Sequence, residues 1–129
     1  MITHVHLGSN DVELSKKFYD ALFEVLGGTQ SWKDSDRNRW FWMRGDQFLV
    51  VGEPLDKSAA DTANGLTIGF CVDSPEQGDA WHAAGLANGG MDCEGVDPPG
   101  IRNRPGGVNI YLAYLRDPDG HKLCALYRE

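Results

Sequence analysis

The sequence lacks the features that mark several protein classes. No apolar run approaches the roughly 18 residues of a membrane-spanning helix, and Met1–His4 lacks the basic and apolar leader of an exported protein. Only three cysteines are present, none of them spaced as CxxC, so neither a zinc finger nor a disulfide framework is predicted. These absences favour a cytoplasmic protein in a reducing compartment.

Positive charge is also scarce. The 12 Lys and Arg residues stand against 19 Asp and Glu residues, which gives a net charge of −7. This balance argues against partners such as nucleic acid or an anionic membrane, and it leaves cationic ligands open. What is present is an ordinary globular composition in 129 residues, long enough for one domain with its own core.

The first half of the chain predicts a strand, a helix and three further strands. Apolar residues at helical spacing, such as Phe18 and Leu22, follow Asn10, which is a typical N-cap. Gly27 and Gly28 are typical of a helix end. The predicted strands span residues 2–8, 29–33, 39–44 and 48–53.

The second half repeats this order. His4 and Thr67 differ by 63 in number, and so do Phe18 and Trp81, which indicates an internal duplication. A helix capped by Ser74 follows the first strand of this half. The predicted strands span residues 66–73, 91–95, 109–116 and the closing strand after 120, with a loop at 96–107. The sequence thus predicts an α+β fold of two βαβββ modules, residues 1–54 and 65–129, joined by a linker at 55–64.

Two such modules resemble the vicinal oxygen chelate superfamily, the group of glyoxalase I, bleomycin-resistance and fosfomycin-resistance proteins and extradiol dioxygenases. The most specific matches are His4-Val5 followed by Asp11–Tyr19, and the Asp-Pro-Asp-Gly hairpin inside Tyr114–Ala125. The resemblance implies a cup-shaped mixed sheet, a small-molecule cavity enclosed by paired modules and a homodimer. It does not imply one reaction, because this fold hosts isomerases, oxygenases, transferases and drug binders.

The resemblance also implies four metal-ligand positions, on the first and last strands of each module. His4 fills the first position, whereas Thr67 and Cys124 stand where metal-binding members usually carry His and Glu. The remaining position falls on Val51, and the nearest carboxylate is that of Glu53. His4 and Glu53 are therefore the candidate catalytic pair and the candidate ligands of a divalent metal (Zn, Ni, Mn or Fe), and the site is predicted to be degenerate. Only one of these four positions carries a His, whereas the iron site of a dioxygenase needs two His and one carboxylate, so a dioxygenase is disfavoured.

The histidines and tryptophans of the first module are candidates for ligand binding. His4 and His6 share one face of their strand, and a histidine there is either an acid–base group or a cavity-lining side chain. Trp40 and Trp42 also share one face, which predicts either a platform for a flat or cationic ligand or ordinary core packing.

The remaining candidates lie in the second module. Arg102 and Arg104 are expected to close over an anionic substrate, or else to lie in a solvated loop. Cys124 is either a nucleophile or an ordinary buried cysteine. Tyr111 and Tyr114 lie on opposite faces of their strand, so at most one of them faces the cup, and Tyr114 is taken as the candidate. Thr67 stands where metal-binding members usually carry a ligand. His121, in the hairpin turn, is expected to be exposed.

Three functions follow from these patterns. The first is binding of a small molecule in the cup by a family member of unknown reaction. The second is a metal-dependent, glyoxalase-like lyase or isomerase acting on a small oxygenated metabolite, with His4 as ligand or base. The third is a non-catalytic drug-binding protein of the bleomycin-resistance kind.

Overall fold

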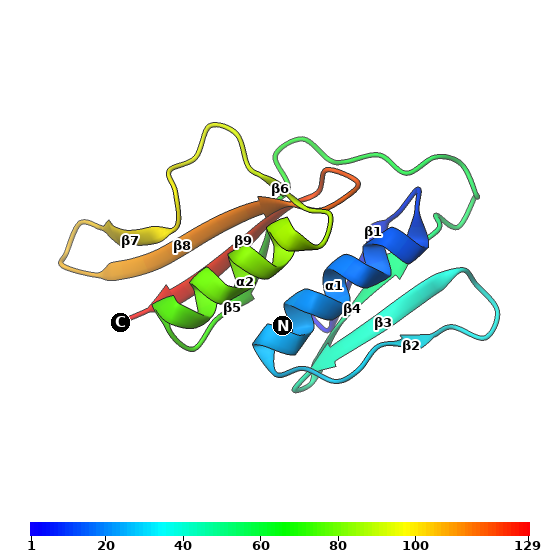
Figure 1. The fold of residues 1–129 in the computed structure, drawn as a ribbon, viewed down its shortest axis with the longest axis horizontal. Coiled ribbons are helices and arrows are strands. Elements are labelled where there is room, and N and C mark those ends of the chain that lie inside the picture. Colours follow the sequence, from blue (N-terminus) through cyan, green and yellow to red (C-terminus); the bar gives the residue numbers. More distant parts are fainter.

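Two helices lie on one side of two sheets in the computed structural model, which describes residues 1–129 (Figure 1). The first sheet has the strand order β1-β4-β3-β2, with β1 and β4 parallel and the other pairs antiparallel. Its elements are β1 (His4–Gly8), α1 (Val12–Leu26), β2 (Trp32–Lys33), β3 (Arg39–Arg44) and β4 (Gln47–Gly52).

The second sheet repeats this arrangement in the order β5-β9-β8-β6, and β7 pairs with β8. Its elements are β5 (Ile68–Cys71), α2 (Pro75–Ala87), β6 (Met91–Asp92), β7 (Gly100–Asn103), β8 (Asn109–Arg116) and β9 (Lys122–Arg128). The predicted α+β fold with mixed sheets is confirmed. The loop predicted at 96–107 is corrected, because it contains the strand β7.

The helix starts follow from side-chain caps. The Asp11 carboxylate accepts a hydrogen bond from the Leu14 N–H at 3.1 Å, so Asp11 caps α1 rather than the predicted Asn10. Ser74 caps α2 as predicted, accepting from the Gln77 N–H at 3.1 Å. Neither helix has the length and apolar character needed to cross a lipid bilayer.

The core lies between the helices and the sheets. Phe18 of α1 and Trp81 of α2 are fully buried there, together with Val51 and Leu123 from the facing sides of β4 and β9. Successive strand residues point to opposite faces, so each sheet has one face against its helix and one face away from it. We refer to the second face as the open face.

The hairpin between β8 and β9 is bound to the first module by buried polar contacts. The Tyr19 hydroxyl donates to the Asp117 carboxylate at 2.6 Å, and burial raises the pKa values of both groups. The His121 Nε2 donates to the Gly8 carbonyl at 2.7 Å. His121 is therefore buried, at 6% exposure, and not exposed as the sequence suggested.

Candidate functional site

A pocket of about 300 Å³ lies between the two modules, where their first strands approach each other. Its lining includes His4 of β1 and Thr67, the residue before β5. Phe48 of β4 and Gly69 and Cys71 of β5 also line it. This volume is at the lower end of the range for ligand pockets, which suits a small organic molecule. We call it the seam pocket.

His4 is held in the seam pocket by two contacts. Its Nδ1 is hydrogen-bonded to the Thr3 hydroxyl at 2.9 Å. Its ring stacks on Phe48, with centroids 4.6 Å apart and planes inclined by 3°, because parallel pairing of β1 and β4 places these residues side by side. The remaining nitrogen, Nε2, has no partner within the chain and is free to bind a ligand.

Gly69, an exposed residue in the lining of the seam pocket, leaves open space beside it. A Cβ atom at this position would meet nothing within 4 Å. Gly69 pairs with Cys124 across β5 and β9, and Cys124 is 6% exposed. Burial raises the pKa of the Cys124 thiol, so this sulfur is a neutral thiol at neutral pH and a poor nucleophile.

Basic side chains surround Tyr114 on the open face of the second sheet. Tyr114 pairs with Cys124, and the Lys122 ammonium lies 5.0 Å from the Tyr114 ring centroid. Arg102 donates to the carbonyls of Gly100, Pro98 and Asp97 at 3.0, 2.8 and 3.1 Å, which holds its guanidinium against the segment that leads into β7. Arg104 lies just beyond β7 and is exposed. The structure thus brings Arg102, Tyr114, Lys122 and Cys124 onto one face; Lys122 had not been singled out from the sequence.

Trp40 and Trp42 lie on the opposite face of the first sheet, against α1. Trp42 is 1% exposed, and its indole N–H donates to Asp20 of α1 at 2.9 Å. The Lys16 ammonium, also on α1, lies 4.7 Å from the Trp40 ring centroid. Of the two interpretations left open by the sequence, core packing fits these indoles and a ligand platform in the cup does not, because they pack in the core and beside the helix.

A different set of aromatic rings lines the open face of the first sheet. Trp32 stacks on Phe41, with centroids 5.4 Å apart and planes inclined by 8°. Phe41 lies 6.2 Å from Phe48, which stacks on His4. This aromatic row (Trp32, Phe41, Phe48 and His4) crosses β2, β3, β4 and β1. Its signal in the sequence was the alternation of Phe41 with Trp40 and Trp42.

The candidate metal ligands are not brought together. His4 pairs with Phe48 at one end of β1 and β4, whereas Glu53 follows Gly52 at the other end. Five residues of strand, roughly 16 Å, separate the two positions. Two ligands of one metal ion must both lie about 2.0–2.6 Å from it, so this separation is too large. No group of three His, Cys, Asp or Glu side chains lies close enough to hold an ion. His4 and Glu53 of one chain therefore do not fit a shared metal.

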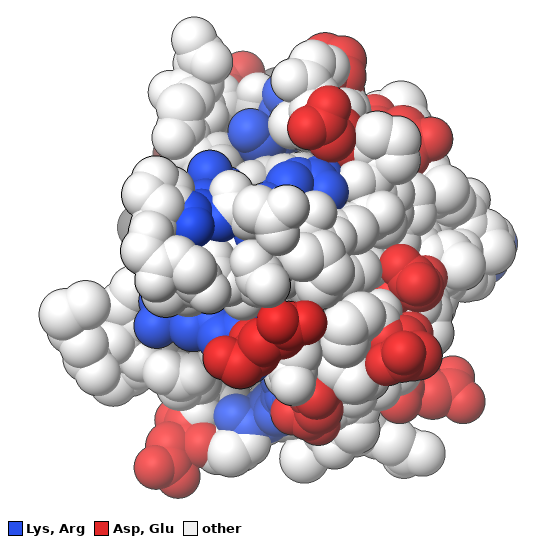
Figure 2. All heavy atoms as spheres, turned by 90° about the vertical axis from the view of Figure 1, so that its left-hand side faces the viewer, with Lys and Arg blue, Asp and Glu red and all other residues white.

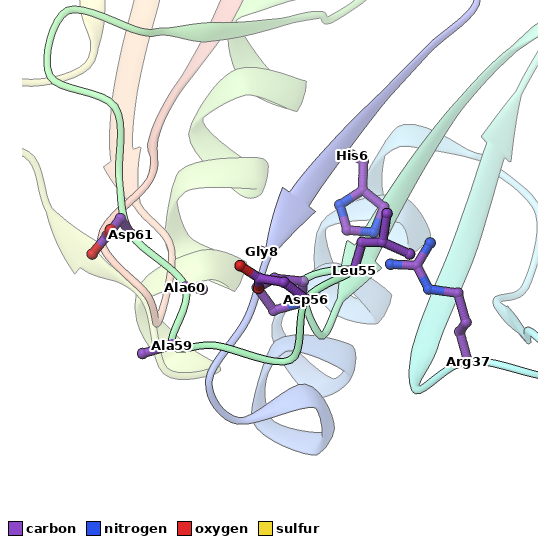
Figure 3. A pocket seen from close by; sticks show the side chains of 9 residues that line it. His6, Gly8, Arg37, Leu55, Asp56, Ala59, Ala60 and Asp61 are labelled. Carbon is purple, nitrogen blue, oxygen red and sulfur yellow. The ribbon is translucent and has the colours of Figure 1, made fainter.

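His6 faces a separate hollow of about 580 Å³ at the other end of β1 (Figure 3). Figure 3 shows His6 and Arg37 directed toward the same space beside Leu55 of the linker. Burial lowers the pKa of His6, and the nearby Arg37 and Arg39 lower it further. His6 is therefore neutral at neutral pH. His4 and His6, predicted to share one cavity, line different hollows.

Charge is unevenly distributed over the surface. Figure 2 views the end of the molecule that carries β7. Lys and Arg side chains gather in the left and central parts of this view, and Asp and Glu lie around them at the top, the right and the bottom (Figure 2). A basic surface region thus exists on a chain with a net charge of −7.

The fold and sequence have relatives of known structure. A glyoxalase/bleomycin resistance protein from Albidiferax ferrireducens T118 is 48% identical over 99% of both chains, with a TM-score of 0.91. A glyoxalase-related enzyme from Fulvimarina pelagi is 19% identical, over 98% of this chain and 86% of its own, with a TM-score of 0.68. Lactoylglutathione lyase from Agrobacterium tumefaciens is 21% identical, over 98% and 92%, with a TM-score of 0.59.

The last two similarities concern the fold alone. No model of a protein family matches the sequence. No curated protein matches it either.

Proposed function

The chain belongs to the glyoxalase/bleomycin-resistance protein family, and from this premise we propose that it binds a small organic molecule in the seam pocket without a metal ion held by His4 and Glu53. One observation supports this most directly: His4 of β1 and Thr67, the residue before β5, line a single pocket. Because the family fold hosts several chemistries, the function has to be argued from this pocket.

The residues around the seam pocket suit binding and orientation of a ligand. Phe48 supplies an apolar wall, while His4 Nε2 and the Thr67 hydroxyl supply hydrogen-bonding groups. In a catalytic version of this function, His4 is the group that exchanges a proton with the ligand, since an imidazole nitrogen can both accept and donate a proton. The unassembled metal ligands favour binding, or metal-free acid–base chemistry, over a metal-dependent lyase or isomerase.

A substitution that fills the pocket tests this proposal. Gly69→Leu adds a side chain where the chain itself leaves open space. A metabolite library would first be screened for compounds that raise the melting temperature of the wild-type protein. We expect these compounds not to raise the melting temperature of Gly69→Leu. The control is Val108→Leu, a substitution at an exposed position outside the pocket lining. Ligands that bind both variants equally would place the binding site elsewhere.

The metal-dependent alternative has its own test. Native protein would be analysed for zinc, nickel, manganese and iron, and the metal-stripped protein titrated with each ion. Stoichiometric metal that is lost in His4→Ala would overturn the metal-free proposal and favour a glyoxalase-like lyase or isomerase. Such a metal would need ligands from a second chain, because His4 and Glu53 of one chain lie at opposite strand ends.

We also propose that the protein is a cytoplasmic homodimer. Apolar side chains such as Trp32 and Ile101 remain exposed, at 44% and 42%, and burial between two copies would remove them from water. Light scattering during size-exclusion chromatography measures the mass directly. A mass of 14.2 kDa would indicate a monomer and contradict the dimer.

A further inference from the structure

We infer that the ligand of the seam pocket is a planar aromatic or conjugated anion, with its ring against the aromatic row and its negative group toward the basic open face of the second module. The inference rests on the proposed function and narrows it to a class of ligand. It also differs from the cationic ligands that the net charge had left open.

The aromatic row offers partly exposed rings beside the seam pocket, although the Arg39 guanidinium lies 5.4 Å from the Phe41 ring centroid. Its last ring pair, His4 and Phe48, is nearly parallel, with planes inclined by 3°, and both residues line the seam pocket. His4 is exposed, Phe48 and Phe41 are half-buried, and Trp32 is 44% exposed. Aromatic faces favour other flat π systems over saturated rings of the same size. The row therefore selects for planarity.

The lining of the seam pocket contains no acidic residue. Among its fifteen residues, Arg44 is the one side chain with a permanent charge, although the chain as a whole has 19 Asp and Glu residues. The Arg44 guanidinium is bound to the Cys71 carbonyl and lies 3.4 Å from the exposed Asp73. A cationic ligand would find no counter-charge in this pocket, so the lining disfavours the drug-binding alternative with a cationic drug.

The open face beside the pocket holds basic groups without carboxylate partners. Lys122 and Arg102 form no ion pair within the chain, whereas Arg116 pairs with Glu94. Thr67 lines the seam pocket and also an adjoining hollow that contains Lys122. In that hollow Glu94 is paired with Arg116, and Lys122 also lowers the Glu94 pKa, while Asp92 contacts the His82 ring at 3.0 Å. An anionic group placed beside Thr67 would therefore meet an ammonium that makes no direct ion pair within the chain.

Four small probes separate planarity from charge. Benzoate is planar and anionic, cyclohexanecarboxylate is anionic but not planar, benzamide is planar and neutral, and benzylamine has an aromatic ring and a positive charge. Binding of each to the purified full-length protein would be measured by isothermal titration calorimetry, with 2-naphthoate as a two-ring planar anion. We expect one of the two planar anions to bind about tenfold more tightly than each of the other three probes.

Two substitutions then separate the ring contact from the charge contact. Phe48→Leu is expected to weaken the planar anion about tenfold and to leave cyclohexanecarboxylate unchanged. Lys122→Gln is expected to weaken both anions alike and to reduce the salt dependence of binding. Lys17→Gln, which removes an exposed, unpaired charge on α1, is the matched control and should change neither. A thermal melt of each variant checks that it is folded.

The outcomes distinguish this inference from the proposed function. If benzamide, benzylamine or cyclohexanecarboxylate binds as tightly as the planar anions and Gly69→Leu abolishes that binding, the inference on ligand class is overturned while the seam pocket stands. If neither planar anion binds, the inference is likewise overturned, and the library screen alone decides the proposed function. Binding of a planar anion that is unaffected by Gly69→Leu would overturn both.

Discussion

The hydrogen bond between Tyr19 and Asp117 joins α1 to the hairpin through two fully buried side chains. Tyr19→Phe would remove the donor and leave a buried carboxylate oxygen without its partner. We expect the free energy of unfolding to fall by about 1–3 kcal/mol, measured by urea denaturation. Tyr127→Phe, at a half-buried tyrosine whose hydroxyl has no partner in the chain, is the control. Equal effects of the two substitutions would show that the buried hydrogen bond contributes little.

His6 makes stability depend on pH. Its pKa is lowered in the folded protein, mainly by burial and further by Arg37 and Arg39. In the unfolded chain the pKa of His6 should be about 6.5. The unfolded state then binds more protons as the pH falls below about 6.5, so stability is full above this pH and decreases as the pH drops through the lowered folded value.

The corresponding measurement compares wild-type protein with His6→Gln. Urea midpoints measured between about pH 5 and 8 should fall more steeply toward acid for the wild type, because glutamine does not titrate. The imidazole signals of His6 followed by NMR give its folded pKa directly. A His6 that titrates at or above the ordinary histidine value would contradict the prediction.

Residue types were predicted from the sequence better than the faces on which they lie. His4 and Thr67 were placed by the repeat, and both reach the seam pocket. The sequence left open whether Trp40 and Trp42 line the cup or pack in the core. Phe41 and Met43, between and after them, are also apolar, so the strand shows no polar alternation that would identify its core face. The separation of His4 from Glu53 depends on the register of β1 against β4, which no local pattern reveals.

Helix α2 approaches β8 closely because it carries a glycine at the contact. A Cβ atom on Gly78 would overlap the ring of Tyr111, which is buried and donates from its hydroxyl to Asp79 at 2.7 Å. Alanine normally favours a helix over glycine by about 1 kcal/mol. Here we expect Gly78→Ala to destabilise the protein by about 1–3 kcal/mol, because overpacking outweighs helix propensity.

Gly69→Ala is the matched control for this substitution. The new methyl group would enter open space at the seam pocket, and Gly69 lacks the positive φ that would strain an alanine. We therefore expect its free energy of unfolding to stay within about 0.5 kcal/mol of the wild type or to rise slightly. Urea denaturation of both variants makes the comparison, and a stabilising Gly78→Ala would contradict the close packing of α2 on β8.

Elements with strong local signals were predicted, and those formed by distant pairing were missed. The helices have caps and helical periodicity, and β3 and β8 have the bounds expected from the sequence. β7 was missed because Gly100–Asn103 lies among prolines and glycines with little apolar alternation. It is a strand because it pairs with the edge of β8, a long-range contact that also positions Arg102.

At the scale of the whole molecule, contacts at both ends of the boundary between the modules hold the seam pocket in place. At one end, the Gln77 side chain donates to the Val25 carbonyl at 3.1 Å. At the other end, the Asp119 carboxylate in the hairpin turn accepts from the Asn10 N–H at 2.8 Å and from the Ser15 hydroxyl at 3.1 Å. The pocket takes its walls from both modules, so its shape depends on their docking.

Asp119→Ala tests whether the modules unfold as one unit. The substitution leaves two polar groups of the first module without their acceptor, and we expect the free energy of unfolding to fall by about 1–3 kcal/mol. If the modules are coupled, native-state hydrogen exchange should show the same loss of protection in α1 and in β9. Asp46→Ala, in the exposed turn between β3 and β4, should change neither. If amide protection is lost only in β9 and its neighbouring strands, the modules open independently. The seam pocket would then be only as stable as the less stable module.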